Sequence, residues 1–123
     1  MGLDMWLVAK KEEDQPKVGY WRKANQIREF FASHVPEKRS ENIEELVVNS
    51  EMLADLKSKI LACLSDRSPE TSENLLPTVG GFFFGSTVYD EMYYQDLEET
   101  LPIIEKAEEL LSDGYQVSYT EWW

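Results

Sequence analysis

The chain has 123 residues, 42% of them hydrophobic, with 24 acidic and 12 basic residues and a net charge of −12. That length supplies one hydrophobic core and not two, so we expect a single domain over residues 1–123, and no apolar run reaches the ~20 residues that a membrane-spanning helix needs. The one cysteine, Cys63, excludes an internal disulfide and, with no Cys-His cluster, a zinc site, which favours a reducing cytoplasm.

The N-terminal third of the sequence predicts one strand and one helix. Leu3–Ala9 is a short apolar run, typical of a buried strand, and a charged loop follows it. From about Tyr20, apolar residues recur at helical spacing, and Pro36 ends the pattern. The residues on the apolar side of this expected helix are Tyr20, Ala24, Ile27, Phe31 and Val35.

The middle of the chain predicts a short strand and a second helix. Glu45–Val48 is a short apolar run, and Ser50 is a suitable N-cap for the helix after it. The apolar side of that helix holds Leu53, Leu56, Ile60 and Leu64, and Cys63 falls there too, as expected for an unreactive core residue. Asp66–Asn74, rich in Ser, Pro and Glu, is expected to be a surface loop.

The C-terminal part predicts a strand, a long helix and a last strand. Leu75–Thr87 places glycines around three consecutive phenylalanines, which favours a core strand. The helix should run from about Val88 to Ser112, kinked or restarted at Pro102, and should end with Gly114 in the left-handed conformation. Tyr115–Trp123 alternates apolar and polar residues like a half-buried strand.

These elements together predict an α+β domain with about three helices on one small, mainly antiparallel sheet. A C-terminal strand beside the first strand would bring Trp6 near Trp122 or Trp123.

The acidic residues are distributed unevenly along the chain. Residues 1–67 hold 12 acids and 11 bases, whereas residues 68–123 hold 12 acids and one base, Lys106. Nucleic-acid affinity depends on Lys and Arg contacts to phosphate, so direct DNA or RNA binding is not expected. The long acidic helix is either an interface for a basic partner or a solvated face that only keeps the protein soluble. The interface candidates are Glu91, Glu98, Glu99, Glu105, Glu108 and Glu109.

The sequence shows no established catalytic motif. The only histidine, His34, is expected to interact with the end of the first helix, and neither Cys63 nor a serine stands in a nucleophile-elbow context. There is no phosphate-binding glycine loop, and no cofactor or metal is predicted. Carboxylates from Asp90 to Glu99 crowd the start of the long helix, where the helix dipole favours acids, and an acid–base pair or magnesium site is the less favoured interpretation.

Two segments combine aromatic and polar residues and are candidates for binding. Gly19–Gln26 (GYWRKANQ) offers two aromatics, two bases and two amides, and Phe82–Asp90 (FFFGSTVYD) pairs aromatics with hydroxyls. If they meet in space, they would form an aromatic pocket with a basic rim, or the anchor of an interface; otherwise they are an amphipathic helix and a capped core strand. The binding candidates are Tyr20, Trp21, Arg22, Lys23, Asn25, Gln26, Phe83, Ser86, Thr87, Tyr89 and Asp90.

The runs MGLDMWL, VGYWRKANQIREFF and LLPTVGGFFFGSTVYDEMYYQDLEET resemble a family of small, uncharacterised bacteriophage and prophage proteins. The resemblance covers most of the chain and is least in the range from Pro36 to Asn74. Some members of that family carry a phosphoglycerate kinase label, which this short chain without a phosphate loop does not support. The resemblance implies a phage accessory protein in a bacterial cytoplasm and no particular catalytic residues.

Two functional hypotheses follow. The favoured one is a non-enzymatic protein that binds a host protein with a basic surface, as an anti-CRISPR-like or other anti-defence inhibitor of a nucleic-acid-binding factor would. The alternative is a small-ligand or nucleotide-binding protein, using Arg22 and Lys23 on phosphate and the phenylalanines on a base. The oligomeric state is left open.

Overall fold

Four antiparallel strands form one sheet in the order β2-β1-β4-β3, in a computed structural model that describes residues 2–38 and 40–123. The strands are β1 (Asp4–Lys10), β2 (Lys17–Arg22), β3 (Leu46–Val48) and β4 (Gln116–Trp122). The central strands β1 and β4 pair along their whole length, which confirms the predicted α+β class and the pairing of the first and last strands. Trp6 lies opposite Thr120, so Trp122 is two residues further along the same face.

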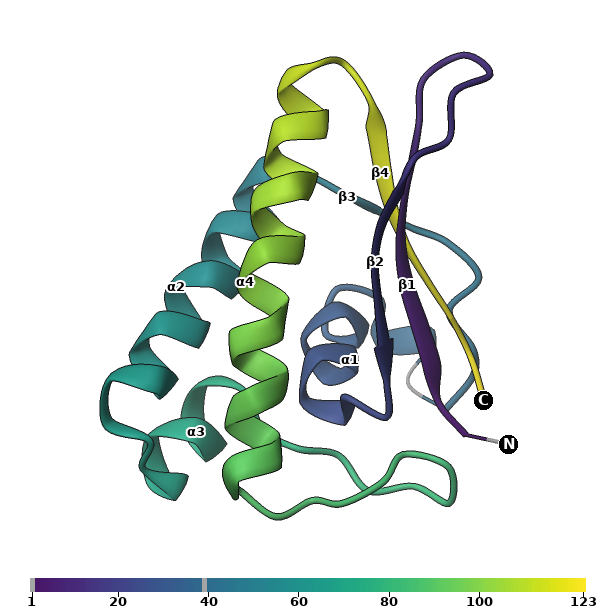
Figure 1. Cartoon of the computed structure of the whole chain (residues 1–123). Coiled ribbons are helices and arrows are strands. Elements are labelled where there is room, and N and C mark those ends of the chain that lie inside the picture. The colour runs from purple at the N-terminus through teal and green to yellow at the C-terminus, as the bar shows by residue number, and fades with distance from the viewer. Residues whose placement is uncertain (1, 39) are drawn as a thin grey trace.

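The helices cover one face of this sheet and leave the other face open (Figure 1). α4 lies between the sheet and α2, so the sheet, α4 and α2 form three successive layers. The described helices are α1 (Asn25–Ala32), α2 (Ser50–Asp66), α3 (Pro69–Leu75) and α4 (Glu91–Ser112), with a short 3-10 turn, η1 (Pro36–Lys38).

The core lies between the sheet and the helices. Alternate residues of β1, Met5 and Leu7, point into it because successive side chains of a strand face opposite sides. Tyr119 of β4 stacks on Phe31 of α1, with ring centroids 4.3 Å apart. Cys63 is buried as predicted, and burial raises the pKa of its thiol, which makes it a weaker nucleophile.

The ends of the long helices follow local capping chemistry. The cap of α2 is Asn49, one residue before the predicted Ser50, and its Oδ1 accepts a hydrogen bond from the Met52 N–H at 2.9 Å. α4 begins at Glu91 rather than Val88, because Asp90 caps it, and it continues through Pro102 without a restart. Gly114 has a φ of +89°, as predicted for the residue that ends this helix.

The prediction of a helix from about Tyr20 is wrong. Tyr20 and Arg22 belong to β2, which pairs with β1, and the helix begins only at Asn25. Tyr20, expected to be buried, is 50% exposed, while its neighbour Trp21 is buried. Pairing with β1 fixes the alternation of this segment, so the helical spacing of Tyr20 and Ala24 was coincidental.

Two further segments differ from the prediction. The expected loop at Asp66–Asn74 contains α3, which begins at Pro69, where a missing N–H is tolerated. The described residues therefore form four α-helices rather than three. The expected strand within Leu75–Thr87 is absent, and the segment is a loop with Phe84 buried and Phe82 95% exposed. Its glycines permit turns, and its Phe83 carbonyl oxygen accepts a hydrogen bond at 2.9 Å from the N–H of Leu3, just before β1.

Candidate functional site

The two candidate segments meet in space, and Asn25 joins them. Its buried Nδ2 donates to the carbonyl oxygens of Phe84 and Ser86, both at 2.9 Å, and its Oδ1 accepts from the Val79 N–H at 3.0 Å. Asn25 therefore holds the loop that precedes α4 against the start of α1. This candidate binding residue has a structural role, because all three bonds satisfy buried or partly buried groups.

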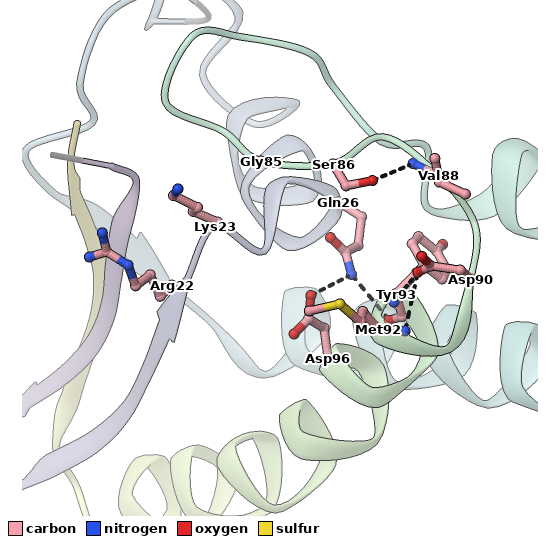
Figure 2. Close-up of a pocket in the computed structure, with 10 residues that line it drawn as sticks. All are labelled: Arg22, Lys23, Gln26, Gly85, Ser86, Val88, Asp90, Met92, Tyr93 and Asp96. Carbon is pink, nitrogen blue, oxygen red and sulfur yellow. Dashed lines mark hydrogen bonds between the residues drawn. The ribbon is translucent and has the colours of Figure 1, made fainter.

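A cleft of about 260 Å³ opens where these segments meet the first turn of α4 (Figure 2). Gly85 has a φ of +84° and approaches Lys23 closely, which shapes one wall. Five of the predicted binding residues line the cleft, and five residues that were not in that set line it as well. The lining residues are Arg22, Lys23, Gln26, Gly85, Ser86, Val88, Asp90, Met92, Tyr93 and Asp96.

The α4 side of the cleft is acidic. Asp90 caps the helix, with its Oδ1 accepting from the N–H groups of Met92 and Tyr93 at 3.1 and 3.2 Å. Burial raises the pKa of Asp96 to about 6, although Gln26 Nε2 donates to its Oδ2 at 3.4 Å and opposes the shift. Asp96 is thus a carboxyl group that changes charge close to neutral pH.

The β2 side of the cleft is basic. Arg22 forms an ion pair with Asp4 at 3.0 Å, and Tyr20 donates to the same Asp4 oxygen at 2.5 Å. Lys23 has no carboxylate within ion-pair distance among the residues that the structure describes. Figure 2 shows the charged ends of Arg22 and Lys23 directed away from Asp90 and Asp96. Arg22 and Lys23 are both exposed.

The other candidate aromatics do not wall this cleft. Trp21 is buried and donates from Nε1 to Thr100 Oγ1 at 2.8 Å, and the Tyr89 hydroxyl accepts from the Thr78 N–H at 3.2 Å. Phe83 contacts Phe82, with ring centroids 4.9 Å apart. The predicted binding residue Thr87 lies outside the cleft as well, and its carbonyl oxygen accepts a hydrogen bond from Thr78 Oγ1. Tyr20 lies on the open face of the sheet. The aromatic pocket with a basic rim is therefore not assembled here from the residues expected to form it.

The acidic candidates of α4 divide into two groups. Glu98 pairs with Arg67 at 2.6 Å and Glu108 with Lys57 at 3.8 Å, so two of the six are partly neutralised by bases distant in sequence. The remaining four are exposed, and none has a basic side chain within 4 Å among residues 2–38 and 40–123. They are Glu91, Glu99, Glu105 and Glu109.

Asp96 and Tyr93 line the cleft but were not among the predicted binding residues, although Asp96 is one of the carboxylates considered for an acid–base pair or magnesium site. Both lie within two turns of Asp90, which had been identified, and helical spacing from it was the available signal. His34 lies just beyond the end of α1, where its Nδ1 contacts the Phe30 carbonyl oxygen at 3.1 Å, in line with its predicted role. Within the described ranges, no group of three or more His, Cys, Asp or Glu side chains is arranged to hold a metal ion.

No family model matches the sequence, and no curated protein or solved structure shows significant similarity to the chain. None of the helices in the described part combines the length and apolar character needed to cross a membrane.

Proposed function

We propose that this protein is a non-enzymatic binding module that recognises a protein with a basic surface through the exposed side of α4. The observation that carries the proposal is a set of four exposed carboxylates that have no basic partner in the described part of the chain, Glu91, Glu99, Glu105 and Glu109. A set of like charges left uncompensated on a well-packed helix works against stability, which favours a role in recognition.

The geometry of α4 supports this use. Its 22 residues span roughly 33 Å at 1.5 Å per residue. Leu97, Ile104 and Ala107 are buried and anchor one side of the helix. The four carboxylates lie on the opposite side of the helix, within an arc of about 120° at 100° per residue. A stripe of this length matches the side of a standard protein interface, and its field would guide a basic partner before contact.

The partner we propose is a host nuclease or another nucleic-acid-binding factor in a bacterial cytoplasm. Such proteins present Lys- and Arg-rich surfaces to phosphate, and an acidic helix covering that surface would exclude nucleic acid. An anti-defence role, such as inhibition of a CRISPR effector, is the specific form of the proposal. The resemblance to phage proteins supports it, as does a net charge that disfavours direct binding of DNA or RNA by the chain itself.

The test is a charge-matched comparison of association rates with the partner captured from host lysate. One variant carries glutamine at Glu91, Glu99, Glu105 and Glu109, and the control carries it at four exposed acids elsewhere, Glu44, Glu45, Glu70 and Glu73. Stopped-flow mixing should show association about threefold to tenfold slower for the α4 variant, with a weaker salt dependence. Equal rates for the two variants, or capture of no protein, would contradict the proposal.

A second candidate function, binding of a small or nucleotide-like ligand, is supported by the cleft. The cleft has a volume of about 260 Å³ and is lined by residues of both candidate segments. The amine of Lys23 lies on one side of it and the carboxyl groups of Asp90 and Asp96 on the other. Mass spectrometry of the denatured protein, purified from a bacterial host, should then show a stoichiometric small molecule that a Lys23→Gln variant loses. A Lys10→Gln variant is the control, because Lys10 is exposed and lies outside the cleft. Protein that carries no small molecule would contradict this candidate function.

A further inference from the structure

The open face of the sheet carries an aromatic pair that the helices do not cover. Trp6 of β1 and Tyr20 of β2 are directly paired in the sheet, and their ring centroids lie 5.8 Å apart at an angle of 45°. Tyr20 is half exposed and Trp6 is partly exposed, because α1 and α4 pack against the opposite face (Figure 1). Each ring offers a flat face on which another ring can stack.

A groove of about 560 Å³ runs beside this pair along β2, which is an edge strand of the sheet. Trp6, Val8 and Tyr20 provide its aromatic and aliphatic surface, and Lys17 and Lys106 line it as well. Its volume lies within the range of pockets that hold small molecules. The groove is distinct from the cleft at α4, since the two share no lining residue.

The two lysines reach the groove from different elements. Lys17 pairs with Val8 beside the irregular register between β1 and β2, which places it on the open face. Lys106 comes from α4, which can approach β2 because Gly19 lacks a side chain: an added Cβ would lie 2.4 Å from Ile103 Cγ2. Lys106 is three residues after Ile103 and so lies on the same side of the helix.

Neither lysine has a carboxylate within ion-pair distance among the described residues. Within the same part of the chain, Lys10, Lys11 and Lys23 lack such a pair as well, but none of them lines this groove, where two unpaired lysines lie together. Two unneutralised amines at one groove therefore make it a place on this acidic protein suited to an anion.

We propose that this groove binds a small molecule that carries a phosphate or carboxylate on a flat aromatic ring, as a nucleoside monophosphate does. The ring would stack on one ring of the Trp6–Tyr20 pair and contact the other, and the anionic group would lie between Lys17 and Lys106. The ligand needs both its ring and its anionic group. The net charge of −12 repels a bare anion, and stacking of the ring adds the contact that offsets this repulsion. The proposal does not rest on the α4 interface, although Lys106 lies between Glu105 and Glu109 in that helix, and the groove shares no lining residue with the cleft.

The test is a titration of the ¹⁵N-labelled full chain followed by NMR, with two aromatic anions as probes, adenosine monophosphate and 2-naphthoate. At least one should cause saturable shifts of the Trp6 indole N–H and of the backbone amides from Val18 to Tyr20. Adenosine by itself and inorganic phosphate by itself should each bind at least about tenfold more weakly, because adenosine lacks the anionic group and phosphate lacks the ring. If only the nucleotide binds, the anion is a phosphate, and if both bind, either anionic group suffices.

Matched lysine variants locate the anion. Lys17→Gln and Lys106→Gln should each weaken binding about threefold to tenfold, whereas Lys10→Gln, which removes an exposed lysine that has no ion pair among the described residues and lies outside both the groove and the cleft, should leave it unchanged. Circular dichroism of each variant confirms that the fold is retained. The proposal is overturned if neither probe gives saturable shifts up to millimolar concentration, if the double Lys17/Lys106 variant binds as well as the wild type, or if Lys23→Gln alone abolishes binding.

Discussion

Replacing Glu121 with glutamine removes the negative charge from an ion pair in the interior of the protein. The side chains of Glu121 and Arg28 are 0% and 1% exposed, and Arg28 Nη2 lies 3.0 Å from Glu121 Oε2. The carboxylate also accepts bonds from Arg28 Nε, from the Tyr119 hydroxyl at 2.6 Å and from the Ile43 N–H at 3.0 Å. This network fastens the segment before β3 to β4 and α1.

The size of the effect follows from the donors that the change leaves behind. Four donor groups point at the carboxylate, and an amide oxygen accepts only about two bonds, so roughly two buried donors lose their partner at about 1–3 kcal/mol each. The loss of the charge itself is offset in part, because Arg28 keeps its bonds to the carbonyl oxygens of Lys38 and Glu41 and its contacts with the rings of Phe84 and Trp123. We therefore expect Glu121→Gln to lower the free energy of unfolding by about 4 kcal/mol, within the range for breaking a buried pair.

Urea unfolding followed by tryptophan fluorescence measures this loss. Glu109→Gln is the control, since Glu109 is exposed and has no basic partner in the described part of the chain, and it should change stability by less than about 0.5 kcal/mol. Arg28→Met should cost a similar amount to Glu121→Gln, and the double variant should cost clearly less than the sum of the two. A loss below about 1 kcal/mol for Glu121→Gln, or additive losses in the cycle, would refute the reasoning.

Three further changes probe packing and charge. Gly19→Ala should destabilise the protein by about 1–3 kcal/mol, because its Cβ would meet the branched side chain of Ile103 at 2.4 Å; an unchanged urea midpoint would contradict this. Burial raises the pKa of Asp96 to about 6, so its carboxyl does not lower the free energy of unfolding below about pH 4 but lowers it increasingly as the pH rises through 6. Asp96→Asn should therefore raise the free energy of unfolding at pH 7 by about 1 kcal/mol and flatten its pH dependence between about pH 4 and 6. Phe84→Ala should cost about 3–5 kcal/mol and Phe82→Ala almost nothing, since Phe84 is buried and Phe82 is 95% exposed; equal losses in thermal or chemical unfolding would show that the loop packs differently.

Local sequence chemistry determined the long helices and the central strands. The repeat of apolar residues, the asparagine and aspartate caps and the left-handed Gly114 suffice to define α2 and α4 to within a few residues, because helices depend on contacts between residues three and four apart. The short apolar run near the start of the chain and the alternation of apolar and polar residues near its end likewise predicted β1 and β4. The acidity of the C-terminal half and the absence of a catalytic motif were also plain from the residues alone.

Tertiary structure decided the rest, because it depends on residues far apart in the chain. The segment from Tyr20 to Arg22 carries both helical and strand spacing, and only pairing with β1 selects the strand and so turns Tyr20 to the open face. The three hydrogen bonds of Asn25 to residues 54 or more positions away bring the two candidate segments together, although neither segment contains a signal for the other. In the same way, the approach of Lys17 and Lys106 rests on the contact of Gly19 with Ile103. Long-range packing sets such juxtapositions, and the local patterns of a single sequence do not encode them.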